Sequence, residues 1–259
     1  MDRHAEVAYE SIAPVYDDFT AHHNYEAWIS TLLGLAVENG LRPGASRALD
    51  VACGTGKSFI PLLDRGWELT ACDISASMAA RAREKAAGRV RIEVADMREL
   101  PVLGSFDLAL CIDDAVNYLH TPAELTAALR AIAANLEPDG LLIFDSNTIT
   151  NYRGFFAERV EVEANGVRMI WEGHGDGTAG PGEISEASFS FEPLEGGTAV
   201  PPELHRQRHH PEPEVRAAIA AAGLELAALY GHGPDGIPYQ PMSEEDHTKA
   251  IYVARGRGA

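Results

Sequence analysis

Basic residues and cysteines are scarce in this chain, and each shortage narrows what the protein can do. Lysine and arginine number 21 against 39 aspartates and glutamates, so the 259 residues carry a formal net charge of −18. Such a surface repels phosphate backbones, and we therefore expect no nucleic-acid partner. The three cysteines, Cys53, Cys72 and Cys111, are odd in number and follow no disulfide-framework spacing. They indicate reduced thiols and a cytoplasmic protein.

Long apolar runs are also absent. No segment approaches the roughly 20 consecutive apolar residues that a membrane helix requires. The opening stretch, MDRHAEVAYE, has none of the apolar core of a signal peptide. We therefore expect no membrane association. With 46% hydrophobic and 23% charged residues, the chain has the composition of a globular protein that buries a sizeable core.

Strand and helix patterns alternate through the first half of the chain. Thr121 and Pro122 form a typical helix start, and Ser75 is a plausible N-cap for a helix that ends at Gly88. Such alternation predicts an α/β fold built on a Rossmann-like, doubly wound sheet that is mostly parallel. The strands are expected at about 46–52, 67–73, 90–96, 106–113 and 141–147, and the first helix at 57–65.

The pattern changes after residue 150. β-like stretches such as VRMIWEGH and EISEASFSFEPL are separated by glycine-rich turns, which predicts an antiparallel β insertion. A helix at 211–223 and strands at 224–231 and 247–256 follow, with a loop between the two strands. We divide the chain into an N-terminal helical lid (1–44), a cofactor-binding core (45–150 and 211–259) and a substrate cap (151–210).

The segment ALDVACGTGKS, residues 48–58, joins a buried strand to a helix pattern through a glycine turn. Gly54 and Gly56 let the backbone turn tightly, and residues from Lys57 onward are expected to be helical. This arrangement presents backbone N–H groups and the positive end of a helix to whatever binds in the turn. It predicts an anionic or carboxylate-bearing cofactor.

Acidic residues stand at the carboxyl ends of the expected strands, where open α/β sheets bind ligands. They are Asp50, Asp73, Asp96 and Asp113. Asp73 lies 17 residues after Gly56, about the spacing at which a carboxylate meets a ribose diol. This spacing alone fits either a nicotinamide or an adenosyl cofactor.

Asp96 distinguishes the two cofactors. A polar acceptor after the third strand suits the exocyclic amine of adenine, with Met97 or Ile74 packed against the ring face; the alternative is that Asp96 caps a helix or turn. A nicotinamide-dependent oxidoreductase would have a complete G-x-G-x-x-G, but Phe59 occupies the last position. That alternative also leaves Asp96 unexplained.

Four motifs in order resemble those of the class I S-adenosylmethionine-dependent methyltransferases. LDVACGTG resembles the family's glycine motif, CDIS its ribose-binding motif, ADMREL its adenine-binding motif and FDLALCIDDAVNYL its motif after strand four. The resemblance implies S-adenosyl-L-methionine as cofactor, S-adenosyl-L-homocysteine as product and an antiparallel last strand. Ala52 departs from the pattern, because many members carry glycine there. The APVYDDF stretch and the N-Y-L segment are similar to small-molecule members, including those of natural-product and deoxysugar amine pathways.

The resemblance implies in-line transfer of a methyl group to an O or N nucleophile of a small-molecule acceptor, driven mainly by positioning. Two alternatives stay open: an NAD-dependent oxidoreductase, and a non-catalytic S-adenosylmethionine-binding protein. The sequence lacks the D/N-P-P-Y/F motif and the Pro-Cys nucleophile of nucleic-acid methyltransferases. We expect a monomer or a homodimer.

The cofactor-binding residues that the resemblance implies come from the N-terminal segment and the strand ends. Tyr16, with Tyr25 or Trp28, resembles lid residues that close over the cofactor; the alternative is core packing of an N-terminal helix. The full expected set is Tyr16, Trp28, Asp50, Ala52, Gly54, Gly56, Asp73, Ile74, Met78, Asp96, Met97, Cys111 and Asp113.

The candidate catalytic residues follow strand four or lie in the lid. Histidine titrates near neutrality, so His120 suits a general base; the alternative is an exposed turn residue before Thr121. Asp113 and Asp114 are paired carboxylates, suited to orient an amino group or simply solvated in a loop. The candidate set is Tyr16, Asp113, Tyr118 and His120.

Two further groups of residues carry weaker signals. The pairs His22-His23 and His209-His210 suggest metal ligands, but no third ligand is evident and we expect no metal. Aromatic residues of the insertion are expected either to wall an apolar acceptor pocket or to form the buried face of the small sheet. These aromatics are Trp171, Phe189 and Phe191.

Overall fold

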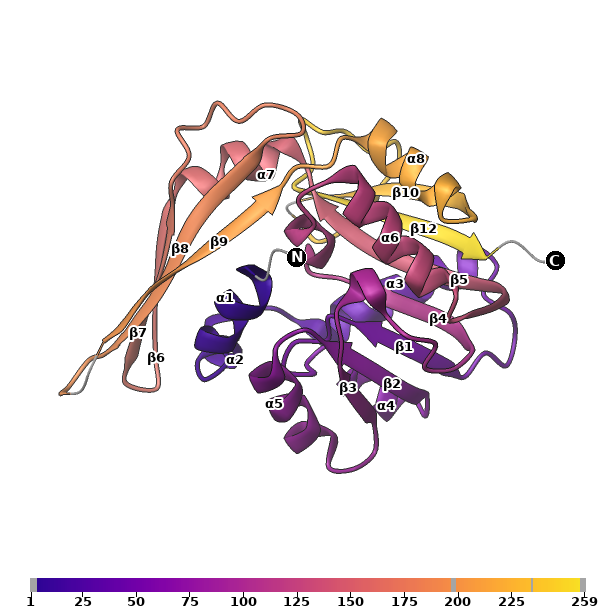
Figure 1. Cartoon of the computed structure of the whole chain (residues 1–259), viewed down its shortest axis with the longest axis horizontal. Coiled ribbons are helices and arrows are strands. Elements are labelled where there is room, and N and C mark those ends of the chain that lie inside the picture. Colours follow the sequence, from indigo (N-terminus) through magenta and orange to yellow (C-terminus); the bar gives the residue numbers. More distant parts are fainter. Residues whose placement is uncertain (1–3, 197–198, 234, 257–259) are drawn as a thin grey trace.

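The computed structural model describes residues 4–196, 199–233 and 235–256. Its main feature is an eight-stranded sheet with the order β11-β10-β12-β5-β4-β1-β2-β3 (Figure 1). Neighbours among β1 to β5 pair in parallel, whereas β12 runs antiparallel to β5 and β10. The predicted α/β class with an antiparallel last strand is confirmed. The strands are β1 Arg47–Val51, β2 Glu68–Asp73, β3 Arg91–Val94, β4 Phe106–Cys111, β5 Leu136–Asn147, β10 Leu224–His232, β11 Pro238–Tyr239 and β12 Lys249–Gly256.

Helices cover both faces of this sheet. All six residues of β4 are buried, because alternate side chains of a strand point to opposite faces and both faces are covered. Leu108 and Leu110 are fully buried, and each contributes about 1.5–3 kcal/mol through the apolar area removed from water. On one face lie α3 (Tyr25–Glu38), α4 (Ile60–Asp64) and α5 (Ala76–Ala86), and on the other α6 (Pro122–Ala133) and α8 (Glu212–Ala221).

Side-chain caps fix the starts of the two helices that follow β2 and β4. The Ser75 hydroxyl accepts a hydrogen bond from the Met78 N–H at the start of α5. Thr121 does the same for the Glu124 N–H in α6, where Pro122 occupies the first turn. Each cap contributes about 1 kcal/mol. Both helix starts agree with the sequence-based prediction.

Three elements differ from the predictions. α4 begins at Ile60 rather than at residue 57, because Gly56, at φ 86°, belongs to turns that continue to residue 59. A helix of five residues also has little macrodipole to offer the turn. β5 begins at Leu136 rather than at residue 141, because Leu136 already pairs with Phe106 of β4 ahead of an irregularity in the register. The predicted loop before β12 contains β11, which pairs with β10.

A four-stranded antiparallel sheet, here called the cap, is inserted between β5 and α8 and confirms the predicted insertion (Figure 1). Its buried side chains Met169, Trp171 and Phe189 pack with Ile12 and Val15 of the N-terminal segment. The cap therefore has an apolar inner face of its own. Its strands, in the order β6-β7-β8-β9, are Arg159–Ala164, Val167–Gly173, Ile184–Pro193 and Val200–Arg208, preceded by α7 (Ile149–Arg153) and a 3₁₀ turn η3 (Phe155–Ala157).

Two short helices, α1 (His4–Ile12) and α2 (Tyr16–Phe19), lie between the cap and the core sheet (Figure 1). Hydrogen bonds attach them to the core. Glu10 accepts one from the Ser75 hydroxyl at 2.7 Å. Asp17 accepts one from Thr55 of the glycine turn at 2.5 Å and forms an ion pair with Lys85 of α5. The N-terminal segment thus covers the edge of the sheet where the strand-end residues gather.

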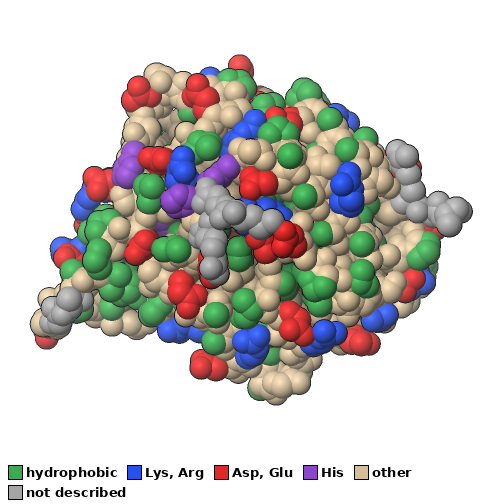
Figure 2. Space-filling model, in the orientation of Figure 1, with side chains coloured by type: hydrophobic (Ala, Val, Ile, Leu, Met, Phe, Trp, Pro, Cys, Tyr) green, Lys and Arg blue, Asp and Glu red, His purple; other side chains and the backbone are tan. Residues whose placement is uncertain are grey.

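The surface carries charges of both signs. On the face drawn in Figure 2, basic and acidic side chains are interspersed, and histidines gather between the cap and the core. Cys53, Cys72 and Cys111 are buried and form no disulfide. Within the described ranges, no helix has the length and apolar character needed to cross a membrane.

Candidate active site

In the glycine turn between β1 and α4, three residues at alternate positions have left-handed backbone conformations. Ala52, Gly54 and Gly56 have φ values of 58°, 55° and 86°. A Cβ on Gly56 would lie 2.4 Å from the Phe59 ring, so only glycine fits there. A Cβ on Gly54 would meet only the Tyr16 ring, at 3.8 Å, so this position faces open space. The turn therefore offers a ligand its backbone at Gly54, while Gly56 serves packing.

Asp73, at the end of β2, supports the same turn. Its two carboxylate oxygens accept hydrogen bonds from the N–H groups of Gly54 and Ser75, both at 2.8 Å. Burial raises the pKa of Asp73 to about 6, although these two bonds oppose the shift. Each oxygen keeps a free lone pair, so the carboxylate can accept two further hydrogen bonds, as a diol requires.

Asp50 lies under the turn and is almost completely buried. One of its oxygens accepts a hydrogen bond from the Ser58 hydroxyl at 2.5 Å, and among the described residues the other has no partner. Burial raises the pKa of Asp50 to about 7. An unpaired buried oxygen is costly, but Asp50 lies beneath the turn and is not among the residues that line the hollows described below.

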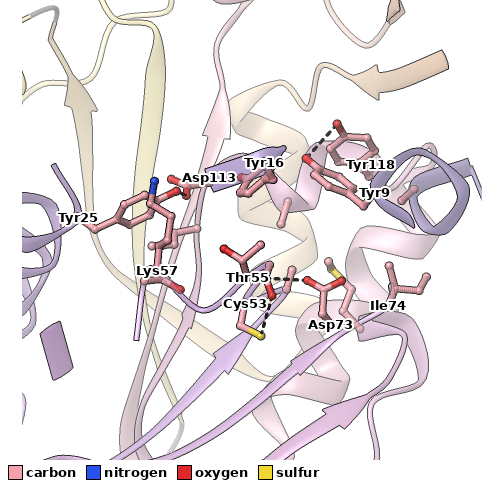
Figure 3. Close-up of a pocket in the computed structure, with 17 residues that line it drawn as sticks. Tyr9, Tyr16, Tyr25, Cys53, Thr55, Lys57, Asp73, Ile74, Asp113 and Tyr118 are labelled. Carbon is pink, nitrogen blue, oxygen red and sulfur yellow. Dashed lines mark hydrogen bonds between the residues drawn. The ribbon is translucent and has the colours of Figure 1, made fainter. Parts of the chain in front are cut away.

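A hollow of about 650 Å³, here called the cofactor hollow, opens above the turn. In Figure 3, Tyr9, Tyr16 and Tyr118 lie across it from Asp73 and Cys53. Eight of the expected site residues line it: Tyr16, Ala52, Gly54, Asp73, Ile74, Met97, Asp113 and Tyr118.

A second hollow of about 460 Å³, the side hollow, continues from the first, since Ala52, Ile74, Met97 and Tyr118 line both. Asp96 and His120 line this one. The Asp96 carboxylate also accepts hydrogen bonds from the backbone and guanidinium of Arg98, at 2.9 and 3.0 Å. Burial would raise the pKa of Asp96, but these bonds outweigh it and lower the pKa. Asp96 is thus both a cap for the 3₁₀ turn η1 (Met97–Glu99) and a wall residue.

Other expected residues lie outside the cofactor hollow. Trp28 lines a third hollow and packs edge-on against His232, with 4.9 Å between ring centroids. Met78 is fully buried against the N-terminal segment, and Cys111 is fully buried in the core. His120 lies at the side hollow, where its Nε2–H donates to the Arg206 carbonyl at 2.9 Å.

Asp113 and Asp114, after β4, have left-handed backbones with φ values of 59° and 53°. Strain of this kind is common at functional sites. Their N–H groups both donate to the Asp145 carboxylate, at 3.0 and 2.5 Å, which holds this backbone in place. The Asp113 carboxylate accepts a hydrogen bond from the Tyr25 hydroxyl at 2.6 Å. Burial raises the pKa of Asp113, and Lys249 offsets part of the rise.

Sequence reasoning missed Lys249 and Asp145. The Lys249 Nζ lies 2.6 Å from Asp114 and 3.3 Å from Asp145, so one cation faces three carboxylates. Lys249 reaches this place because β12 runs antiparallel to β5 and pairs its first residue with Asn147. No local pattern around Lys249 signals that contact.

A hollow of about 1120 Å³, the cap hollow, lies under the cap. Trp171 and Phe189 are buried in the cap and also line this hollow, so both interpretations of these aromatics apply. Phe191 packs against the same cluster but is not among the lining residues. His205 and Gln207 of β9, which the sequence did not single out, also line it.

The cofactor hollow and the cap hollow share a wall. Tyr9, Tyr16, Asp113 and Tyr118 line both. Two molecules bound in these hollows would therefore meet at a boundary formed by three hydroxyls and a carboxylate. Tyr9 of α1 is the one residue of this shared wall that sequence reasoning did not single out, because only folding brings the first helix to the wall.

The histidine pairs have other partners. His209 contacts Glu244 at 3.2 Å, and His210 contacts Glu214 at 2.9 Å. In the part of the chain that the structure describes, no three His, Cys, Asp or Glu residues are grouped as a metal site would require.

A family model described as a methyltransferase domain matches residues 48–140. This segment contains the glycine turn together with Asp73, Asp96 and Asp113. The chain is an S-adenosylmethionine-dependent methyltransferase. Its cofactor is S-adenosylmethionine, and the open Gly54 backbone and the Asp73 carboxylate, which both line the cofactor hollow, fit such a molecule.

Relatives of this methyltransferase extend beyond the matched segment. YqeM of Bacillus subtilis, assigned as a methyltransferase, is 29% identical over 224 residues, 84% of this chain and 87% of that protein. The dTDP-3-amino-3,6-dideoxy-α-D-glucopyranose N,N-dimethyltransferase of Streptomyces fradiae is 29% identical over 195 residues, 75% of each protein. The structure of the sugar N-methyltransferase KedS8 from Streptoalloteichus sp. ATCC 53650 has a TM-score of 0.72 and 26% identity, covering 94% of this chain and 93% of that one.

Proposed function

We propose that this methyltransferase methylates the amine of a small hydroxylated molecule, an amino sugar, held in the cap hollow. The observation that carries the proposal is the wall that the cofactor hollow and the cap hollow share. A methyl donor on one side and an acceptor on the other would meet at Tyr16, Asp113 and Tyr118. The named substrates of the Streptomyces fradiae enzyme and of KedS8 support a sugar amine as the acceptor class.

The cofactor would be held by residues of the glycine turn and the strand ends. We assign the ribose hydroxyls to Asp73, the adenine ring to the side hollow between Ile74 and Met97, and the amino-acid portion to the glycine turn at Gly54. When bound, S-adenosylmethionine supplies a methyl group on a sulfonium, which is a good leaving group. The protein therefore has to position and desolvate the acceptor more than to activate it.

An amine acceptor fits the charges at the shared wall. Asp113, Asp114 and Asp145 outnumber Lys249, so the wall attracts a cationic amine. Asp113 is buried and has a raised pKa, which suits it to accept a proton from the amine nitrogen. We assign the proton to Asp113 rather than to His120, because His120 lies at the side hollow and donates to the Arg206 carbonyl. Tyr16 and Tyr118 would orient the amine.

The test is a methyl-transfer assay with S-adenosylmethionine and dTDP-3-amino-3,6-dideoxy-α-D-glucopyranose. We expect S-adenosylhomocysteine and an N-methylated sugar, measured by mass spectrometry. Asp113→Asn should lower kcat at least about 100-fold, the scale of general acid–base effects. Tyr25→Phe, which removes the hydrogen bond from the Tyr25 hydroxyl but leaves the Asp113 carboxylate in place, is the matched control and should cost less than tenfold.

Three outcomes would contradict the proposal. Binding of S-adenosylmethionine without methyl transfer to any amine would favour a non-catalytic binding protein. Equal methylation of the sugar that carries a hydroxyl in place of the amine would point to an O nucleophile. Thermal stabilisation by NAD but not by S-adenosylhomocysteine would support an oxidoreductase.

A further inference from the structure

Two buried polar atoms at the cap hollow have no hydrogen-bond partner among the described residues. They are Nε2 of His205, on β9, and Oδ1 of Asn147, at the end of β5. Both side chains are only 2% exposed, and both residues line the cap hollow. Buried polar atoms in native proteins are nearly always paired, so each needs a partner that the chain does not supply.

A chain of hydroxyls fixes the chemical character of His205. The Tyr9 hydroxyl donates to the Tyr118 hydroxyl at 3.1 Å, which leaves the Tyr118 proton for Nδ1 of His205 at 2.8 Å. Nδ1 therefore accepts, and the neutral ring carries its proton on Nε2. Burial lowers the pKa of His205 to about 4, so the ring stays neutral near physiological pH. The unpartnered Nε2–H is a hydrogen-bond donor.

A second chain fixes the character of Asn147. The Asp114 carboxylate only accepts, so Gln207 presents its NH₂ group to it, at 2.6 Å. The Gln207 carbonyl oxygen then accepts from Nδ2 of Asn147 at 2.9 Å. The Asn147 oxygen is left as an unpartnered acceptor. Asp114 can only accept, so it fixes the amide orientation of Gln207, and Gln207 in turn fixes that of Asn147.

The hydrogen-bond donor on His205 and the hydrogen-bond acceptor on Asn147 lie on one side of the cap hollow. His205 and Gln207 are two residues apart on β9, so their side chains lie on the same face of the strand, about 7 Å apart along it. Asn147 is hydrogen-bonded to Gln207. One small polyhydroxylated molecule can span that separation. The nearby Tyr118 places this side of the hollow next to the shared wall.

We infer that His205 and Asn147 form an acceptor-binding subsite that recognises a hydroxyl adjacent to the methylated amine, with His205 donating to its oxygen and Asn147 accepting from a neighbouring O–H or N–H. The inference rests on the proposed function and adds to it a required feature of the acceptor. An amine without a neighbouring hydroxyl would leave both protein atoms unpaired. Such a site rejects the analogue that lacks the polar group more strongly than an apolar pocket can.

The test combines one variant with a series of acceptors. His205→Phe keeps a ring of similar shape and removes the donor. With dTDP-3-amino-3,6-dideoxy-α-D-glucopyranose we expect KM to rise about tenfold and kcat to change less than threefold, the loss of one buried hydrogen bond. In the unmodified protein, the analogue lacking the 4-hydroxyl or the one lacking the 2-hydroxyl should show a similar rise. In His205→Phe that discrimination should disappear.

Two further variants are controls. His205→Gln retains an N–H donor and should recover most of the lost affinity. Arg206 is next to His205 on the strand, and its side chain contacts Glu186 at 2.9 Å. The Arg206→Gln variant should therefore leave KM unchanged. Binding of S-adenosylhomocysteine, measured by calorimetry, should be equal in all variants, which also reports that each has folded.

The outcomes separate the inference from the proposed function. If the enzyme methylates the amine but its KM and its discrimination between hydroxyl analogues are the same in His205→Phe, the inference alone would be overturned. Water would then satisfy Nε2 of His205 and Oδ1 of Asn147. Absence of amine methylation in every variant would overturn the proposed function. In that case the ¹⁵N spectrum of His205 still tests the subsite. A ring protonated on Nδ1 would make Nε2 an acceptor and overturn the subsite. An Nε2–H resonance that shifts when the sugar nucleotide is added to the S-adenosylhomocysteine complex would support it.

Discussion

Several carboxylates at or just after the strand ends of this methyltransferase are buried. Asp50, Asp73 and Asp113 all have pKa values that burial raises. A raised pKa means that the folded protein resists the charged form, so each carboxylate gains from a partner that stabilises its charge. The cofactor and the acceptor would supply such partners. Ligand binding and protonation at these residues should therefore be coupled.

Asp73 should make cofactor binding sensitive to acid. With a pKa of about 6, it is ionised above neutrality, and the ionised form accepts ribose hydroxyls. The affinity for S-adenosylhomocysteine should hold between about pH 7 and 8 and fall about tenfold per unit below about pH 6, because binding then requires release of a proton. Calorimetric titration measures this. Asp73→Asn should bind weakly at all pH values without that slope, whereas an acid-insensitive unmodified protein would contradict the ribose assignment.

Lys249 should be needed for folding stability. Burial opposes its charge, but the carboxylates around it outweigh burial and raise its pKa. Lys249→Met leaves Asp114 and Asp145 without their cation and should lower the free energy of unfolding by about 3 kcal/mol at neutral pH. The loss should shrink as the pH falls to about 5, because Asp145, whose folded-state pKa burial raises above its unfolded value, then becomes protonated. Urea unfolding at two pH values measures both effects, and a pH-independent loss would contradict them.

Local sequence patterns identify the candidate site residues that stand at or just after the end of a parallel strand. Gly54, Asp73, Ile74 and Met97 all follow parallel strands and line one hollow as the strand-end rule predicts. Lys249 and His205 could not be predicted in the same way. Their positions depend on pairing between distant strands, which no single segment encodes. Tyr9 reaches the wall for a similar reason, because α1 folds back over the core.

At the scale of elements, the glycine turn combines two functions in one loop. Gly56→Ala should lower the free energy of unfolding by about 2 kcal/mol or more, because the left-handed backbone and the contact with Phe59 both oppose a side chain. Gly54→Ala meets no close atom and should cost about 1 kcal/mol of stability. Its larger effect should fall on binding of S-adenosylhomocysteine. Urea unfolding and calorimetry of the two variants measure this division, and equal stability losses would contradict it.

The elements themselves were largely predictable, and their boundaries less so. The starts of α5 and α6 follow from Ser75 and Thr121, whose side chains cap the helices locally. The start of α4 was misplaced, because turn residues and a helix share the same composition there. The two-residue strand β11 has no periodicity of its own and forms only because β10 offers an edge. The cap was predictable as antiparallel strands, but its packing against α1 and α2 was not.

For the whole molecule, charge gives the clearest expectation. The net charge of −18 is spread with basic residues interspersed, and Figure 2 shows no continuous basic surface on the face drawn. Duplex DNA and tRNA should therefore not bind at physiological ionic strength. Fluorescence anisotropy with labelled oligonucleotides measures this, with the sugar nucleotide as the positive ligand. Binding that falls steeply with added salt would contradict the expectation.

The placement of α1 and α2 has a consequence for the sequence of events in one turnover. These helices cover the cofactor hollow and, through Tyr9 and Tyr16, also form part of the wall of the cap hollow. An acceptor seated against that wall would hold both helices closed over the methyl donor. The donor would then have to enter first and the demethylated product leave last, an ordered kinetic mechanism in which S-adenosylhomocysteine competes with S-adenosylmethionine and not with the acceptor.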